Sequence, residues 1–201
     1  LLGALVLVAI AIPVSVLIWW AGWMRHAEET PPATAPQPAA PASGPFLIYL
    51  SGIGDISGVY QTRFEDDLLA AIAERVPGLV VITDVFAFSV RNRSLTDSRS
   101  LGWFWAWVHA ERLRKRGPIK RVGKLINLRN TLHLTVAADG RYGPVYNYGV
   151  AEMILQSLVR HGYVPGSGAP IALLGYSGGG QIALALPPQR VVRQHPYNRR
   201  Q

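Results

Sequence analysis

The sequence predicts an α/β domain with a mostly parallel sheet and helices on both of its faces. Three short runs are almost wholly apolar, as expected of strands buried on both sides: Phe46–Leu50, Leu79–Phe86 and Pro170–Leu174. Helical segments separate these runs, and strands that alternate with helices favour a parallel sheet. Ligands bind such sheets at the carboxyl ends of the strands. We therefore expect functional side chains there.

The first helix is predicted to follow Thr62, because Thr62 and Glu65 have the spacing of a capping box. Pro77 and Gly78 then end it. Apolar residues recur at helical spacing in between, at Phe64, Leu68, Ile72 and Val76.

Three more helices are predicted between the second and third strands. The first covers Leu101–Arg116, and the third is capped by Asn147 and ends at Gly162. The middle helix covers Val122–Ala138, with Leu125, Leu128, Leu132 and Val136 on one side. A last helix follows the third strand and includes residues 181–185.

Residues 1–24 predict a membrane-spanning helix. Leu1–Trp23 holds no charged residue, and at about 1.5 Å per residue such a helix crosses a hydrocarbon core of roughly 30 Å. Three tryptophans near its end are typical of a membrane interface. A cleaved signal peptide is the alternative interpretation. Because the chain starts at Leu1, we expect the natural N-terminus to lie upstream, and the side of the membrane stays open.

The remaining domain boundaries follow from composition. Residues 25–45 are rich in Pro and Ala and predict a tether, residues 46–186 hold the α/β domain, and residues 187–201 form a basic, irregular tail. The formal net charge of +8 suits anionic partners. The absence of cysteine excludes disulfides, thiolate metal sites and a cysteine nucleophile. The histidines lack ligand-like partners one helical turn away, so no metal and no cofactor are predicted.

One segment predicts contact with a membrane surface. Its aromatic and basic residues are Trp103, Trp105, Trp107, Arg114, Lys115 and Arg116. This composition is typical of interfacial elements on anionic lipid. The alternative is that the tryptophans pack in the core beside a solvated basic face. No nucleic-acid-binding motif accompanies the charge, so the expected partner is a lipid bilayer and not nucleic acid.

The most specific motif is Gly175-Tyr176-Ser177-Gly178-Gly179, which lies between the third strand and the last helix. A sharp strand-to-helix turn of this kind places its serine in a strained conformation and needs small neighbours. It lifts the hydroxyl above the sheet, and the amide of Gly178 points to where an oxyanion would form.

Residues 170–185 resemble the nucleophile elbow of the α/β-hydrolase superfamily. The resemblance implies that Ser177 is an acyl-accepting nucleophile and that Gly178 supplies one oxyanion-hole amide. The second amide would come from the loop after the first strand, at Gly52 or Ile53. The implied reaction is hydrolysis of an acyl ester, thioester or amide, and a lipid-like substrate would suit a membrane-anchored protein.

The sequence departs from the superfamily after the elbow. The superfamily order places an acid and then a histidine after the serine. Here no Asp or Glu follows Ser177, and His195 is the one histidine that does. Pro187 and Pro188 begin an arginine-rich tail, which predicts a truncated or shifted reading frame or a natural basic tail. A non-catalytic membrane-bound scaffold or lipid-binding module is therefore the alternative to an enzyme.

A more distant alternative is a dinucleotide-binding fold. Gly52, Gly54 and Ser57 follow the first strand, and Asp84 lies near the end of the second, where a ribose-binding acid would stand. Ser57 occupies the third glycine position, however, and the helix is predicted to start only after Thr62. A strand-end turn residue is the simpler interpretation of Asp84. The sequence leaves the substrate and the oligomeric state open.

Overall fold

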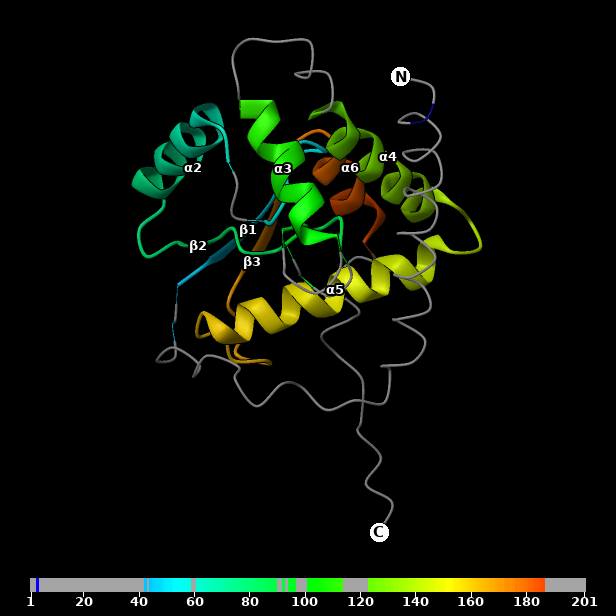
Figure 1. The fold of residues 1–201 in the computed structure, drawn as a ribbon. Helices are drawn as coiled ribbons and strands as arrows, with labels where there is room; N and C mark the ends of the chain where they lie inside the picture. Colours follow the sequence, from blue (N-terminus) through cyan, green and yellow to red (C-terminus); the bar gives the residue numbers. More distant parts are fainter. Residues whose placement is uncertain are drawn as a thin grey trace. The chain divides into compact units, whose positions relative to one another are not determined.

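The computed structural model describes Gly3, Ala42, residues 44–58, 61–89, Asn92, 94–96, 101–113 and 123–186. The chain divides into two units, residues 1–37 and 38–201, and the elements below lie in the second. In chain order they are β1 (Phe46–Leu50), α2 (Arg63–Arg75), β2 (Val80–Ile82), α3 (Gly102–Leu113), α4 (Lys124–Ala138), α5 (Gly143–Arg160), β3 (Ile171–Gly175) and α6 (Gly178–Ala185) (Figure 1). These three strands and five helices confirm the predicted α/β class.

The described sheet has the order β2-β1-β3, and both pairings are parallel. Phe46 at the start of β1 lies between Val80 and Ile171. All five residues of β1 are buried, and successive side chains of a strand point to opposite faces, so both faces of β1 are covered. Strand β2 is shorter than the predicted 79–86 run, and Asp84 lies beyond its end.

Different segments cover the two faces of β1. Leu47 and Tyr49 form an apolar cluster with Leu69 of α2. On the other face, Phe46 packs edge to face against Tyr163, which follows α5, with 5.4 Å between the ring centroids. The central strand is thus enclosed on both sides, as the apolar run predicted.

Helix α2 begins with the predicted capping box. The Thr62 hydroxyl accepts a hydrogen bond from the Glu65 N–H, and the Glu65 carboxylate accepts one from the Thr62 N–H at 2.7 Å. Among the apolar residues at helical spacing, Ile72 packs against the cluster of Leu47, Tyr49 and Leu69, whereas Phe64 is 63% exposed. Glu65 and Leu69 are the buried residues of this helix. The Tyr49 hydroxyl donates to Glu65 at 2.6 Å, and this contact turns the Glu65–Leu69 side of the helix towards the sheet.

Helix α4 buries a partly polar side. Leu128 is 47% exposed, whereas the buried positions of this helix are Ile126, Arg129, Asn130, His133 and Ala137. Two of them, Arg129 and Asn130, donate hydrogen bonds to backbone carbonyl groups of loops. The His133 ring lies beside Tyr146 of α5, with 6.0 Å between the ring centroids. Hydrogen bonding to those carbonyls therefore sets the orientation of α4.

Helix α5 starts at Gly143, so Asn147 lies inside the helix and is not its cap. The Asp139 carboxylate accepts hydrogen bonds from the N–H groups of Arg141 and Tyr142, and Pro144 suits the first turn. At the other end, Gly162 has a φ of 90°, which agrees with its predicted role in ending the helix.

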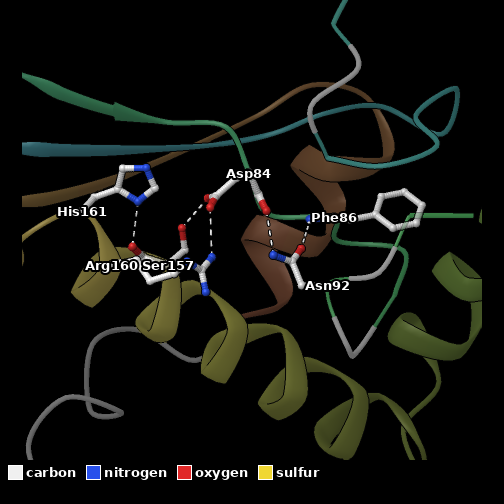
Figure 2. A network of polar contacts seen from close by, with 6 residues as sticks. All are labelled: Asp84, Phe86, Asn92, Ser157, Arg160 and His161. Atoms are coloured by element: carbon white, nitrogen blue, oxygen red, sulfur yellow. Dashed lines mark hydrogen bonds and ion pairs between the residues drawn. The ribbon is translucent and has the colours of Figure 1, made fainter. Parts of the chain in front are cut away.

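Asp84 ties the loop after β2 to the end of α5. Its carboxylate accepts hydrogen bonds from the Ser157 hydroxyl and, at 2.9 Å, from Arg160 Nη2 (Figure 2). Asn92 closes the same loop by bonding both the Asp84 carbonyl and the Phe86 N–H. Burial alone would raise the pKa of Asp84, but the bonds from Ser157 and Arg160 outweigh it and hold the pKa below its ordinary value.

We expect Asp84→Asn to reduce the sensitivity of the fold to acid. Because the pKa of Asp84 is lower in the folded state, its ionised form adds stability at neutral pH, and this contribution is lost as the pH falls below about 4. Urea midpoints measured from pH 7 to pH 3 should fall less steeply for the variant. An equally steep fall in both proteins would contradict this role for Asp84.

Several predicted regions lie outside the described residues. They are the span 1–24 apart from Gly3, most of the tether and the tail 187–201. Among the residues that are described, none of the helices has the length and apolar character needed to cross a membrane. The last part of the predicted tether contacts the domain, since the Ala42 N–H donates to the Gly162 carbonyl at 3.0 Å.

Candidate active site

Ser177 stands at the turn between β3 and α6 in a backbone conformation that glycine normally adopts. Its φ is 52° and its ψ is −117°. The Gly179 N–H donates to the Tyr176 carbonyl at 2.9 Å and closes a four-residue turn around it. These angles match the second position of a type II′ turn, which strongly favours glycine. A serine there carries backbone strain of the kind found at functional sites.

The glycines of the motif have almost no space around them. A Cβ atom on Gly175 would lie 2.5 Å from Gly180 Cα, and one on Gly179 would lie 2.2 Å from the Leu50 carbonyl oxygen. A Cβ atom on Gly178 would lie 2.6 Å from Ile53 Cγ2. All three distances are shorter than real Cβ contacts. The tight turn at Ser177 therefore depends on these glycines sterically.

The loop after β1 lies against the elbow. A Cβ atom on Gly52 would lie 3.4 Å from Ser177 Cβ, and the Ile53 side chain reaches Gly178. The four residues predicted from the sequence, Ser177, Gly178, Gly52 and Ile53, are thus neighbours in the fold. They come from two loops that parallel strands bring to the same edge of the sheet.

This arrangement suits the binding of an oxyanion. Gly178 is the first residue of α6, and the first amides of a helix have no acceptor within that helix. The positive end of the helix dipole adds to the attraction for negative charge. Backbone N–H groups in such a place can stabilise the negative oxygen that develops when a nucleophile attacks a carbonyl group.

The buried Asp55 side chain holds the loop after β1 from within. Its carboxylate accepts hydrogen bonds from the N–H groups of Ile56, Ser57 and Gly58 and from the Ser51 hydroxyl. Burial raises the pKa of Asp55, although these four hydrogen bonds oppose the shift. Asp55 was not among the residues predicted for the site. An aspartate that follows glycines after a strand often forms a turn, and this local pattern could have identified Asp55.

Asn130 of α4 holds the same loop from outside. Its Nδ2 donates to the Ile53 carbonyl at 2.9 Å and to the Asp55 carbonyl at 2.8 Å, and its side chain is fully buried. Arg112 of α3 adds a hydrogen bond from Nη1 to the Gly54 carbonyl. No local pattern marks these residues, because their partners lie far away in the sequence.

We expect Asn130→Ala to destabilise the domain and to disturb the loop beside Ser177. The change leaves two buried carbonyl groups without their donor, which should cost about 2–4 kcal/mol in the free energy of unfolding. Chemical denaturation followed by tryptophan fluorescence measures this cost. Asn127→Ala, on the less buried side of the same helix, is the matched control, and equal stability of the two variants would contradict the assigned role.

The other predicted contact residues are not all accessible. Trp103 is 75% exposed and Trp107 is partly exposed, but Trp105 is only 6% exposed and packs in the core. For Trp105 the alternative interpretation, packing in the core, is therefore correct. Arg114, Lys115, Arg116 and His195 lie outside the described residues.

Other kinds of site receive little support in the described part of the chain. No group of three or more His, Asp or Glu side chains there is placed to hold a metal ion. Asp84 is engaged with Ser157 and Arg160, and α2 starts at Arg63, beyond the glycines of the loop after β1. This placement disagrees with a dinucleotide fingerprint, in which the helix begins at the glycines. Comparisons with protein-family models, curated proteins and solved structures find no match to this chain.

Proposed function

We propose that this domain is a serine hydrolase of the α/β-hydrolase kind, with Ser177 as the nucleophile. The backbone of Ser177 is the observation that carries the proposal. A serine in a glycine-type conformation costs stability, and it is surrounded by glycines that permit the turn and by the loop after β1. A strained, exposed serine beside two loops that can hold an oxyanion is the arrangement that acyl transfer requires.

In the proposed reaction, Ser177 Oγ attacks the carbonyl carbon of an ester, thioester or amide. The carbonyl oxygen becomes negative and is stabilised by the amides of Gly178 and of Gly52 or Ile53. The leaving group departs with a proton, and water then releases the acyl group from Ser177. A general base has to take the Ser177 proton, since a serine hydroxyl alone is a weak nucleophile.

The surroundings of Ser177 favour an apolar acyl group. Phe64 of α2 and Tyr176 of the elbow are both exposed, and their rings lie 6.3 Å apart. Ile53 and Phe88 lie against Gly178. A lipid-like acyl substrate suits these residues. It also suits the predicted membrane anchor and the two exposed tryptophans of α3, which would bring the site close to a bilayer.

The test is covalent labelling with a fluorophosphonate probe, which reacts with activated serines. We expect the full chain, kept in a mild detergent, to be labelled at one site and Ser177→Ala to lose the label. Ser167→Ala, in the exposed loop before β3, is the control and should keep it. Labelling that survives in Ser177→Ala would overturn the assignment of the nucleophile.

One observation favours the non-catalytic alternative, a membrane-bound scaffold or lipid-binding module. Across the described residues, no side chain accepts a hydrogen bond from the Ser177 hydroxyl, so no base is seen in contact with it. The labelling experiment decides between the two functions. A folded full chain that does not react with the probe would favour the binding module.

A further inference from the structure

Arg129 of α4 is a buried cation with only neutral partners. It is 7% exposed, and its Nη1 donates to the Phe88 carbonyl at 3.2 Å and to Asn130 Oδ1 at 2.9 Å. A guanidinium group carries five N–H donors. In the part of the chain that the structure describes, no carboxylate pairs with Arg129, and its Nε and Nη2 have no acceptor.

The neighbours of Arg129 do not neutralise its charge. Burial lowers the pKa of Arg129 to about 10, so the side chain remains charged at neutral pH. Burial and the charge of Arg129 hold the pKa of His133 well below its ordinary value, so His133 is neutral. Burial raises the pKa of Tyr146, which keeps that phenol neutral too. A buried charge without a counter-ion is strongly unfavourable, and a ligand of opposite charge relieves it.

Phe88 and Asn130 connect the guanidinium of Arg129 to the elbow. The Phe88 carbonyl accepts its hydrogen bond, and the Phe88 ring would lie 3.3 Å from a Cβ atom on Gly178. Asn130, next to Arg129 in the chain, holds the carbonyl of Ile53, whose side chain also reaches Gly178. Helices α4 and α6 are in contact (Figure 1). Arg129 is therefore linked to the Ser177 turn by two short chains of contacts, one through Phe88 and the other through Asn130 and Ile53.

We propose that Arg129 binds an oxyanion group, a carboxylate or a phosphate, on the molecule that enters the Ser177 site. This inference rests on the proposed function and narrows its substrate class to acyl compounds that carry a negative charge. In this proposal Ile53 and Phe88, which lie against Gly178, contact the acyl part, and Nε and Nη2 of Arg129 donate to the anion. Arginine suits this role because its planar group binds two oxygens of a carboxylate or phosphate at once.

The test measures thermal unfolding and does not depend on catalysis. The full chain carrying Ser177→Ala is heated in detergent with 10 mM inorganic phosphate, with 10 mM octanoate, or with sodium chloride of the same ionic strength. We expect at least one of the two anions to raise the midpoint by about 2–4 °C over chloride. The arm that responds identifies the anion as phosphate or carboxylate. No rise with either anion would overturn the proposal.

Substitutions then assign the effect to Arg129. Arg129→Gln removes the charge but keeps a donor for the Phe88 carbonyl, and we expect the rise to disappear. Arg75→Gln, at the exposed end of α2, is the control and should keep it. A rise that survives in Arg129→Gln would show that the arginine has a purely structural role. If that variant does not fold, Arg129→Met replaces it, since methionine also removes the charge, and a rise as large as that of the parent would overturn the proposal.

The two proposals fail in distinguishable ways. An anion-dependent rise without probe labelling would keep the anion site and reject catalysis by Ser177. If the unchanged chain is labelled by the probe but no anion raises the midpoint of thermal unfolding, Ser177 remains the proposed nucleophile and the anion site at Arg129 is rejected.

Discussion

Replacing Ser177 by glycine is expected to make the protein more stable and to abolish its labelling by fluorophosphonate. The φ of 52° with ψ of −117° is strained for serine and accessible to glycine. Relief of strain should add about 1–3 kcal/mol, and the greater freedom of glycine in the unfolded chain takes back roughly 0.5–1 kcal/mol. We expect a net gain near 1 kcal/mol in the free energy of unfolding, measured by chemical denaturation.

The matched variant is Ser177→Ala, which also loses the hydroxyl but keeps the strain, because alanine has a Cβ atom. Its stability should stay within about 0.5 kcal/mol of the parent. The difference between the glycine and alanine variants therefore isolates the cost of the backbone conformation. If the glycine variant is the less stable of the two, the turn at Ser177 is not strained and the main argument for a functional serine is lost.

Among glycine-to-alanine substitutions at the site, Gly179→Ala should reduce the free energy of unfolding the most. The new Cβ atom would lie 2.2 Å from the Leu50 carbonyl oxygen and 2.4 Å from that of Ser51. Both are backbone atoms at the end of the central strand, so neither can rotate away. We expect a loss of about 3 kcal/mol or more, together with loss of labelling as the loop beside Ser177 moves.

Gly140→Ala is the control for this change. Gly140 lies in the turn before α5, and nothing stands within 4 Å of a Cβ atom built there. Its substitution should alter the free energy of unfolding by less than about 0.5 kcal/mol. A Gly179→Ala variant that unfolds at the same denaturant concentration as this control would contradict the packing of α6 against β1.

The features that sequence patterns predicted well are those with a local physical cause. The capping box at Thr62 and Glu65 is a contact between near neighbours, and it is present. The apolar runs predicted the strands because a strand buried on both faces has to be apolar along its length. The closeness of Gly52 and Ser177 followed from the rule that parallel strands end at one edge of the sheet.

The features that were missed depend on contacts between distant parts of the chain. Leu128 belongs to the apolar side of α4 and is 47% exposed, whereas Arg129 and Asn130 are buried. Polar side chains lie inside because the loops after β1 and β2 present carbonyl groups there. The periodicity of residues within one helix cannot predict that carbonyl groups of distant loops will lie beside it. The same reason explains why Arg129 was absent from the predicted site.

The order of strands in the sheet also has a consequence for how the protein folds. The central strand β1 pairs with β3, and Phe46 lies beside Ile171, so nearly all the rest of the described chain lies between these partners. Contacts between such distant segments slow folding, because a long loop has to close before they are made. On the ribosome, β1 emerges long before β3. The nucleophile turn is therefore assembled late, after the helices that surround it have been synthesised.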